Sequence, residues 1–344
     1  FFFSKGIDYQ FKIYLNGHEL WEQEGMFTYV DVDLTDYLKD NNELKVVLMP
    51  VPDLGFIHEG GGADETGRKN ARESAKPAVS YGWDWHPRLV TCGIWDETSL
   101  IVRKPVRLTD IWLDYTLNAD LTQAALQLKV SGVQLPGSSY KWTLKDPSGK
   151  TVLEKAGKLT TDAQTIESEL VNPVLWWPNG YGNPDLYTNE LSLLDGNGKT
   201  VDTYTGKTGF RRVKLTVNPS KARWIFPESG SLPPASFEVN NRMIFAKGSN
   251  WVHPEVFMGV VTPERYSEQI VLAKNAHFNI FRVWGGGVVN KEAFFDLCDE
   301  LGIMVWQEFP LACNFYSGKE AYLKVLEQEA ISIVTRVRKH ASLA

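Results

Sequence analysis

Short runs in the first two-thirds of the sequence alternate apolar and polar residues, a pattern typical of β-strands with one buried face. The run from Tyr9 to Leu15 is followed by Asn16-Gly17, a strong two-residue hairpin signal, and then by a returning strand from His18 to Trp21. Leu44 to Leu48 is a further strand. Because the pattern starts in mid-course, residues 1–104 are predicted to form an all-β sandwich, a partial jelly roll that lacks its first strands.

A second block of short strands covers residues 105–217. Turn signals at Asp146-Pro147-Ser148-Gly149 and Asp195-Gly196-Asn197-Gly198 separate its apolar runs. About seven such strands over this length predict an immunoglobulin-like β-sandwich, although the Cys…Trp…Cys pattern of antibody domains is missing. The candidate strands are Ile111–Leu117, Ala124–Val130, Tyr140–Lys145, Thr165–Leu170 and Leu186–Leu194.

From about residue 235 the hydrophobic period lengthens to that of helices alternating with short strands. Three βα units are expected over residues 235–344, which predicts the first part of a (β/α)8 TIM barrel, a fold of ~250 residues when complete. Their expected parts are a strand at Met243–Lys247, a helix capped by Thr262-Pro263, a strand at Ile280–Trp284, a helix from N-cap Asn290 to Gly302, a strand at Ile303–Trp306 and a helix at Lys319–Lys339.

Composition excludes several classes of partner. A formal net charge of −6 offers no basic surface to nucleic acid, and no apolar run reaches the ~20 residues of a membrane span. Cys92, Cys298 and Cys313 match neither a disulfide framework nor a zinc pattern. The opening residues lack the features of a signal peptide. The location therefore stays undetermined, with periplasmic, secreted and lysosomal ones all open. The sequence does not determine the oligomeric state.

Two aromatic residues flank a carboxylate at Trp83-Asp84-Trp85, after a long polar, glycine-rich loop from Gly55 to Ala78. Loops of that length are often functional. A carboxylate between two indoles can hold sugar hydroxyls while the rings stack on the sugar, and the twelve tryptophans of the chain favour such a surface. From the residues alone the structural interpretation is slightly favoured, namely a loop that is anchored by two buried rings, with Asp84 capping a turn.

Arg282, Trp284 and Glu308 stand at the carboxyl ends of predicted parallel strands, where barrel enzymes keep their active sites. Arg282 can orient a carboxylate through two parallel hydrogen bonds, or it can form a structural ion pair. Glu308 is a candidate acid or base, but glycoside hydrolysis needs two carboxylates, so a binding or supporting role is favoured. Gly285-Gly286-Gly287 lacks the spacing of a phosphate-binding loop and is interpreted as a tight connection.

Two other groups receive structural interpretations. The segment from Trp176 to Gly182 resembles a binding loop, but its apolar, proline-turned character favours a plug between domains. Asp296, Asp299 and Glu300 fall on a predicted helix and are expected to be solvated charges.

Together these pieces resemble glycoside hydrolase family 2, and within it the β-mannosidases. The resemblance covers the whole chain in the right order: a sugar-binding-like sandwich, an immunoglobulin-like domain and a barrel. It rests on five segments, namely YGWDWHPRLVTCGIW, LWWPNGYG, TGFRRVKL, FEVNNRMIFAKGSNW and FRVWGGG…FFDLCDELGIMVWQEF.

The resemblance also implies roles for individual residues. Asp84 would reach into the sugar pocket on a loop supported by Trp83 and Trp85, and Arg282 would hold the nucleophile carboxylate. Trp251 and Trp284 would shape the pocket. His86 stands where the family pattern WDWGP has glycine, and His253 interrupts the pattern NWxP.

The same resemblance implies retaining hydrolysis of terminal β-D-mannosides, with both reacting glutamates expected beyond Ala344 and no catalytic residue in this chain. It also implies a reaction that requires no metal and no cofactor. On that basis the chain is expected to be a fragment, inactive by itself, that contributes to recognition of a β-linked mannose-containing oligosaccharide. The alternatives are another exo-glycosidase of the family, such as an exo-β-glucosaminidase or a β-galactosidase, and a non-catalytic carbohydrate-binding protein.

Overall fold

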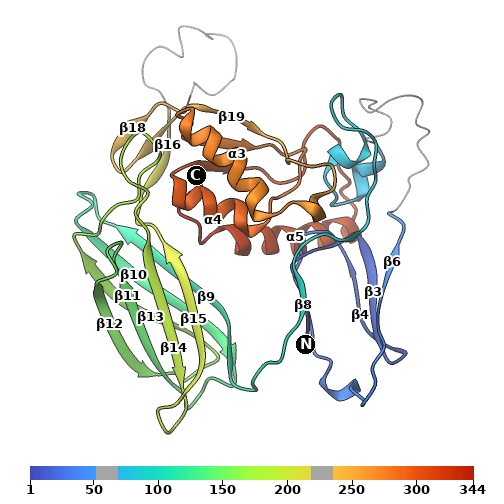
Figure 1. Cartoon of the computed structure of the whole chain (residues 1–344), viewed down its shortest axis with the longest axis horizontal. Coiled ribbons are helices and arrows are strands. Elements are labelled where there is room, and N and C mark those ends of the chain that lie inside the picture. The colour runs from blue at the N-terminus through green and yellow to red at the C-terminus, as the bar shows by residue number, and fades with distance from the viewer. Residues whose placement is uncertain (52–68, 218–234) are drawn as a thin grey trace.

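The computed structural model describes residues 1–51, 69–217 and 235–344 and shows a β-rich chain in three parts. Two β-domains stand side by side, and the C-terminal part, which carries the long helices, lies above and between them (Figure 1). Most of the predicted loop from Gly55 to Ala78 falls outside the described residues. Its described remainder runs into two short 3-10 helices, η2 (Asn70–Glu73) and η3 (Ala78–Tyr81).

The first β-domain contains the predicted hairpin. Asn16 and Gly17 both have positive φ, as a two-residue turn requires, and Leu15 pairs with His18 across it. Three sheets, ordered β5-β1-β8, β4-β3-β6 and β2-β7, surround a buried cluster that includes Phe11 and Ile13. Their elements are β1 (Phe2–Ser4), β2 (Ile7–Asp8), β3 (Gln10–Leu15), β4 (His18–Glu24), β5 (Val30–Val32), η1 (Thr35–Tyr37), β6 (Leu44–Met49), β7 (Gly93–Ile94) and β8 (Thr98–Leu100).

The second β-domain packs two antiparallel sheets, β13-β10-β9 and β12-β11-β14-β15, around one apolar core. Trp142 is fully buried there, and its indole N–H donates to Asn189 Oδ1 at 2.7 Å. The strands are β9 (Arg107–Leu117), β10 (Gln123–Val133), β11 (Ser139–Lys145), β12 (Thr151–Lys158), β13 (Ala163–Val171), β14 (Tyr187–Leu194) and β15 (Thr200–Thr208). The pattern missed β12 and β15, which are the two edges of their sheet and bury few side chains.

A small antiparallel sheet joins this domain to the C-terminal part. It is formed by β16 (Val213–Val217), β17 (Ala235–Val239) and β18 (Arg242–Ile244). The prediction that Met243–Lys247 begins the parallel sheet is therefore wrong, because Met243 pairs antiparallel with Glu238. Asn240 and Asn241, both at positive φ, make the tight turn that the pattern did not reveal.

The C-terminal part is built on a parallel sheet, β19 (Gly248–Trp251), β20 (Ile280–Val283) and β21 (Met304–Gln307). The connecting helices are η4 (Met258–Val260), α3 (Pro263–Asn275) and α4 (Glu292–Leu301), and α5 (Glu320–Val337) follows β21. After α5 the chain returns beside the sheet, where Leu343 forms a parallel bridge with Val305. None of the helices in the described ranges is both long and apolar enough to cross a membrane.

Two of the three helix-terminating residues predicted from the sequence are confirmed. Thr262 caps α3 by accepting the N–H of Arg265, and Gly302 ends α4 in the left-handed conformation. The prediction of Asn290 as the N-cap of α4 is wrong, because the cap position is Lys291. The Asn290 side chain instead accepts hydrogen bonds from Trp251 Nε1 at 3.2 Å and Tyr266 Oη at 3.3 Å.

Helix α5 docks on the first β-domain through a buried carboxylate. Glu329 is 1% exposed, and its two oxygens accept the backbone N–H groups of Met26, Phe27 and Thr28 at 2.7–2.9 Å, as well as the Thr28 hydroxyl. Burial raises the pKa of Glu329, whereas these four donors lower it. A Cβ atom on Gly25 would lie 2.4 Å from Glu329 Oε1, so glycine is needed for this approach.

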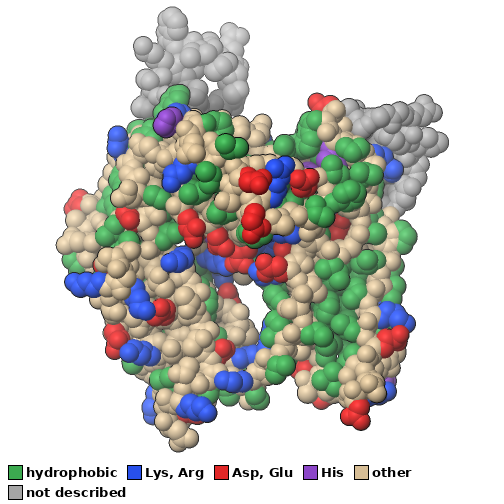
Figure 2. Space-filling model, in the orientation of Figure 1, with side chains coloured by type: hydrophobic (Ala, Val, Ile, Leu, Met, Phe, Trp, Pro, Cys, Tyr) green, Lys and Arg blue, Asp and Glu red, His purple; other side chains and the backbone are tan. Residues whose placement is uncertain are grey.

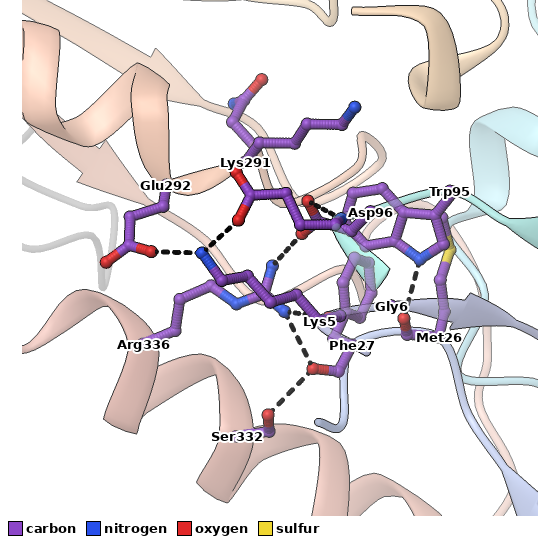
Figure 3. Close-up of polar contacts among 12 residues, drawn as sticks. Lys5, Gly6, Met26, Phe27, Trp95, Asp96, Lys291, Glu292, Ser332 and Arg336 are labelled. Carbon is purple, nitrogen blue, oxygen red and sulfur yellow. Dashed lines mark hydrogen bonds and ion pairs between the residues drawn. The ribbon is translucent and has the colours of Figure 1, made fainter. Parts of the chain in front are cut away.

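The next turns of α5 continue the same contact (Figure 3). Ser332 donates to the carbonyl of Phe27 at 2.8 Å, and Arg336 bonds to the carbonyl of Lys5 at 2.6 Å and pairs with Asp96 at 3.3 Å. Glu329, Ser332 and Arg336 recur at helical spacing and so form one polar docking face, which we call the α5 latch.

Charged side chains gather over α4 and α5 in the middle of the molecule, between the two β-domains (Figure 2). Lys5 of the first domain pairs with Glu292 of α4 at 2.8 Å, and Lys339, which follows α5, pairs with the same carboxylate. These ion pairs reinforce the α5 latch from the side of α4.

The segment from Trp176 to Gly182 is a plug between the second β-domain and the C-terminal part, as predicted. Trp176 is fully buried and donates its indole N–H to the carbonyl of Asp299 at 2.8 Å. Asn179 bonds through its side chain to the carbonyls of Lys274 and Phe278, at the end of α3. The parallel sheet is thus held from both sides, by this plug and by the α5 latch.

Candidate active site

A tight turn of the first β-domain carries Asp84 and Trp85 at its tip. Trp83 and His86 close it with two backbone hydrogen bonds, at 2.9 and 3.3 Å. Asp84 is exposed, and within the described ranges it makes no hydrogen bond or ion pair. The turn therefore does not use the Asp84 carboxylate as a cap, which leaves this group free to meet a ligand.

The turn rests on Trp284 of the parallel sheet. The Trp83 and Trp85 rings lie 5.0 and 6.0 Å from the Trp284 ring, and the backbone N–H of Val79 donates to the carbonyl of Gly286 at 3.1 Å. The structure therefore brings together three aromatic residues that the sequence singled out, two from one domain and one from another.

The three glycines after Trp284 make this contact possible. The N–H of Gly287 bonds back to the carbonyl of Trp284, which closes a tight turn. A Cβ atom on Gly286 would lie 2.2 Å from the Trp284 ring, and one on Gly285 would lie 2.7 Å from the carbonyl of Phe309. The loop is thus shaped around an indole ring, in agreement with its interpretation as a tight connection.

Arg282 and Glu308 form an ion pair at the strand ends. Arg282 Nε lies 2.6 Å from Glu308 Oε1, and a terminal nitrogen of the same guanidinium donates to Asn250 Oδ1 at 3.1 Å. The second oxygen of Glu308 accepts the N–H of Gly285 at 2.8 Å. Asn250, Arg282 and Trp306 occupy paired positions on β19, β20 and β21, so these side chains share one face of the sheet.

This geometry limits what Glu308 can do. Both of its oxygens already accept hydrogen bonds from Arg282 and Gly285, as suits an ionised group with a fixed orientation. The Arg282 side chain remains 42% exposed, which leaves room for a further acceptor. Arg282, Asn250 and Glu308 therefore form a rigid polar support beside the aromatic cluster.

Trp251 lies on the other face of the sheet. It is one position from Asn250 and packs in the helix-facing core, with its ring 4.9 Å from Phe281 and 4.8 Å from Phe294. The structure thus separates Trp251 from the other six site residues predicted from the sequence. Strand alternation explains the separation, because neighbouring residues point to opposite faces.

Two buried histidines complete the aromatic cluster. The His253 ring lies 6.0 Å from Trp85 and 5.3 Å from His86. Burial and the neighbouring His86 lower the pKa of His253 to about 4, and burial also lowers the pKa of His86. The sequence pointed to them only as departures from a pattern, because a lone histidine in a loop carries no spacing signal.

A second cluster of polar side chains, formed by α4 and the chain after α5, has a structural role. Asp299 is 5% exposed and bonds to His340 Nδ1 at 2.8 Å and to the N–H of Ser342 at 2.7 Å, so its prediction as a solvated charge is wrong. One ligand atom each of Asp296, Asp299 and His340 lies within 4.8 Å of the others, a spacing that a metal ion could use. The hydrogen bonds of Asp299 already serve to place the returning chain beside β21.

Comparison with known proteins gives this architecture a class. Residues 2–96 match the family model described as the glycosyl hydrolase 2 galactose-binding domain-like domain, and residues 106–211 match that of the glycosyl hydrolases family 2. The chain belongs to glycosyl hydrolase family 2.

The relatives and structures that resemble it include several β-mannosidases. It is 30% identical to "Beta-mannosidase B" of Emericella nidulans and 31% identical to that of Thermothelomyces thermophilus, over 98% of this chain and 40% and 39% of theirs. The chain therefore spans about 40% of the length of the curated relatives it matches.

Among solved structures, a β-D-mannosidase from Dictyoglomus thermophilum aligns with a TM-score of 0.85 and 32% identity, over 100% of this chain and 42% of that one. A β-glucuronidase from Parabacteroides merdae aligns with a TM-score of 0.75 at 19% identity, over 99% of this chain and 39% of that one, which shows a shared fold.

Proposed function

We propose that the full-length protein is a retaining exo-glycosidase that removes terminal β-D-mannose residues from β-mannosides, and that this chain supplies much of its sugar-binding side. The observation that carries the proposal is the contact of Trp83 and Trp85, which flank Asp84 on a turn of one domain, with Trp284 of another. Trp284 follows the strand that carries Arg282, whose partner Glu308 is bonded to the next residue, Gly285. Ligand sites are common at such domain junctions. The similarity to β-mannosidases over 98% of the chain supports the choice of sugar.

In this proposal the chain binds and positions, and the reacting groups lie elsewhere. Retaining hydrolysis needs two carboxylates ~5–5.5 Å apart, one as nucleophile and one as acid and base. Glu308 is already bonded through both oxygens, which suits a supporting role. The resemblance to the family implies that the two reacting glutamates lie beyond Ala344. Arg282 would hold one of them, Asp84 would accept sugar hydroxyl protons, and Trp83, Trp85 and Trp284 would present apolar ring faces to the sugar.

The same proposal interprets the three parts of the chain. Residues 1–104 would be a jelly-roll sugar-binding domain, residues 105–217 an immunoglobulin-like domain, and residues 235–344 the first part of a TIM barrel. The parallel order β19-β20-β21, the helices between them and the bridge from Leu343 to Val305 support the barrel.

The experiment that tests this proposal is a comparison of aryl glycosides with the full-length protein. We expect the β-mannoside to have the highest kcat/KM among the β-mannoside, β-galactoside, β-glucosaminide and β-glucuronide. A higher value for one of the others would assign a different exo-glycosidase, and binding of mannosides without any hydrolysis would assign a carbohydrate-binding protein.

Replacing Asp84 with asparagine in the full-length protein is expected to lower kcat/KM for the β-mannoside about tenfold to thirtyfold. The amide keeps the shape but loses a charged acceptor, and such a bond contributes ~1.5–2 kcal/mol. The measurement is kcat/KM together with the melting temperature. Asp40→Asn, at another exposed position of the first domain, is the matched control and should change neither. A lower melting temperature with unchanged kcat/KM would remove Asp84 from the active site.

A further inference from the structure

Two buried histidines meet where the first β-domain touches the parallel sheet. His86 closes the Trp83–His86 turn, and His253 follows β19. Their rings lie 5.3 Å apart at 67°, and each also contacts Trp85, at 5.7 and 6.0 Å. They are 5% and 8% exposed. These contacts form a continuous row of rings from His253 through Trp85 to Trp284, with Asp84 at the tip of the turn that the row supports.

The hydrogen-bond surroundings of the ring nitrogens favour the neutral form of both histidines. His86 Nδ1 lies 2.7 Å from the carbonyl of Pro87, which makes it the protonated nitrogen of that ring. His86 Nε2 and His253 Nδ1 are buried and find no hydrogen-bond partner within the described part of the chain. A buried lone pair without a donor is a modest cost, but a proton there would add a buried charge whose N–H has no acceptor.

Charged groups around the pair do not offset a positive charge on it. Asp8, which lines the same cavity of about 280 Å³ as both histidines, is already paired with Lys76 and accepts from Thr91. Glu255, two residues after His253, pairs with Arg265 at 3.1 Å. The other titratable or charged groups on the segments that meet here include Tyr81, Asp84, Arg88, Cys92 and Lys291.

We propose that His86 and His253 are positioning residues: as a neutral pair they hold the turn that carries Asp84 against Trp284, and protonation of the pair releases that turn. The cavity beside them provides space into which a charged ring can turn. The use of Asp84 for substrate rests on the proposed function, whereas the closing of the turn does not.

The direction of the pH effect follows from the shifts. The pKa of His253 is about 4 in the closed state against an ordinary value of 6.5, so the open state binds more protons between these two values. The equilibrium constant for closing the turn is therefore at its maximum above pH 6.5 and decreases as the pH falls toward 4. Each pH unit inside this window should lower the closing equilibrium about tenfold.

The test is hydrogen–deuterium exchange of the full-length protein at pH 7.5 and 5.0, corrected for the intrinsic exchange rate and measured on peptides covering residues 79–90. We expect protection of this segment to fall at least tenfold at pH 5.0 in the wild type. In His253→Phe, which keeps an aromatic ring but cannot be protonated, protection should fall several times less than in the wild type, and the remaining fall is due to His86. His18→Phe, at an exposed histidine, is the matched control and should behave as the wild type.

Protection that is independent of pH in the wild type, or that falls equally in His253→Phe, would overturn the proposal. Should His253→Phe fail to fold, His253→Gln offers a second side chain that does not titrate, with the same expectation. In parallel, KM for the β-mannoside should rise between pH 7.5 and 5.0 in the wild type and rise less in His253→Phe, with kcat less affected. If the protein hydrolyses no glycoside, the exchange result still decides the role of the histidines. Failure of the proposed function and failure of the histidine proposal can therefore be told apart.

Discussion

Arg282→Lys is expected to lower kcat of the full-length protein on an aryl β-mannoside about a hundredfold, or ~2.7 kcal/mol. Arginine contacts Glu308 and Asn250 with different nitrogens of one planar group and keeps part of its side chain exposed for another acceptor. Lysine retains the charge but offers a single point donor, so it cannot hold both partners and a third group in fixed directions. The measurement is steady-state kinetics, where KM should change much less than kcat.

The matched control for this prediction is Arg88→Lys, which makes the same change at an exposed arginine of the first domain. We expect wild-type kinetics from it. A kcat for Arg282→Lys within threefold of the wild type would reduce the Arg282–Glu308 contact to a structural ion pair, which is the other interpretation that the sequence allowed.

Glu329→Ala is expected to weaken docking of the first β-domain on α5 by ~3–5 kcal/mol. The substitution leaves the buried backbone N–H groups of Met26 and Phe27 and the half-buried one of Thr28 without their acceptor. The measurement is urea unfolding of the full-length protein, followed by hydrogen exchange of peptides that contain residues 26–28. These peptides should lose protection at a lower urea concentration than peptides from the second domain.

Two variants frame this result. Glu329→Gln retains one carbonyl acceptor and should cost about half as much, whereas Glu327→Ala removes an exposed carboxylate from the same helix and should cost almost nothing. Equal stability of Glu329→Ala and Glu327→Ala would mean that the α5 latch contributes no net docking energy.

The sequence predicted well those features that depend on neighbouring residues. Asn16-Gly17 makes its own turn, and Thr262 with Pro263 starts its own helix, whatever the rest of the chain does. Placement of Arg282, Trp284 and Glu308 at the ends of parallel strands followed from the βα pattern, because topology alone brings such ends to one edge. The contact between Trp83 and Trp284 agrees with the resemblance, which had put both residues at one pocket.

Features that depend on distant partners could not be predicted in this way. Glu329 and Arg336 stand on a helix where charged residues usually face water, and only the loop at Met26–Thr28 and the Asp96 carboxylate explain their burial. The prediction for Asp299 was wrong for the same reason, because its partners His340 and Ser342 lie more than 40 positions away. Trp251 is a residue type that often lines sugar pockets, but the register of β19 decides which face of the sheet it occupies. The register of such a short strand cannot be inferred from its sequence.

The α5 latch also sets an order of events during synthesis on the ribosome. Met26 and Glu329 are separated by 303 positions, so the amides of residues 26–28 leave the exit tunnel long before their acceptor exists. At ~5–20 residues per second the delay is roughly 15–60 s. During that time the nascent first domain presents three unpaired amides and the ring of Phe27. The Trp95 ring, which later meets the Phe27 ring edge to face, joins them once it has been synthesised. A nascent-chain chaperone that covers this site would shield both the unpaired amides and the two rings.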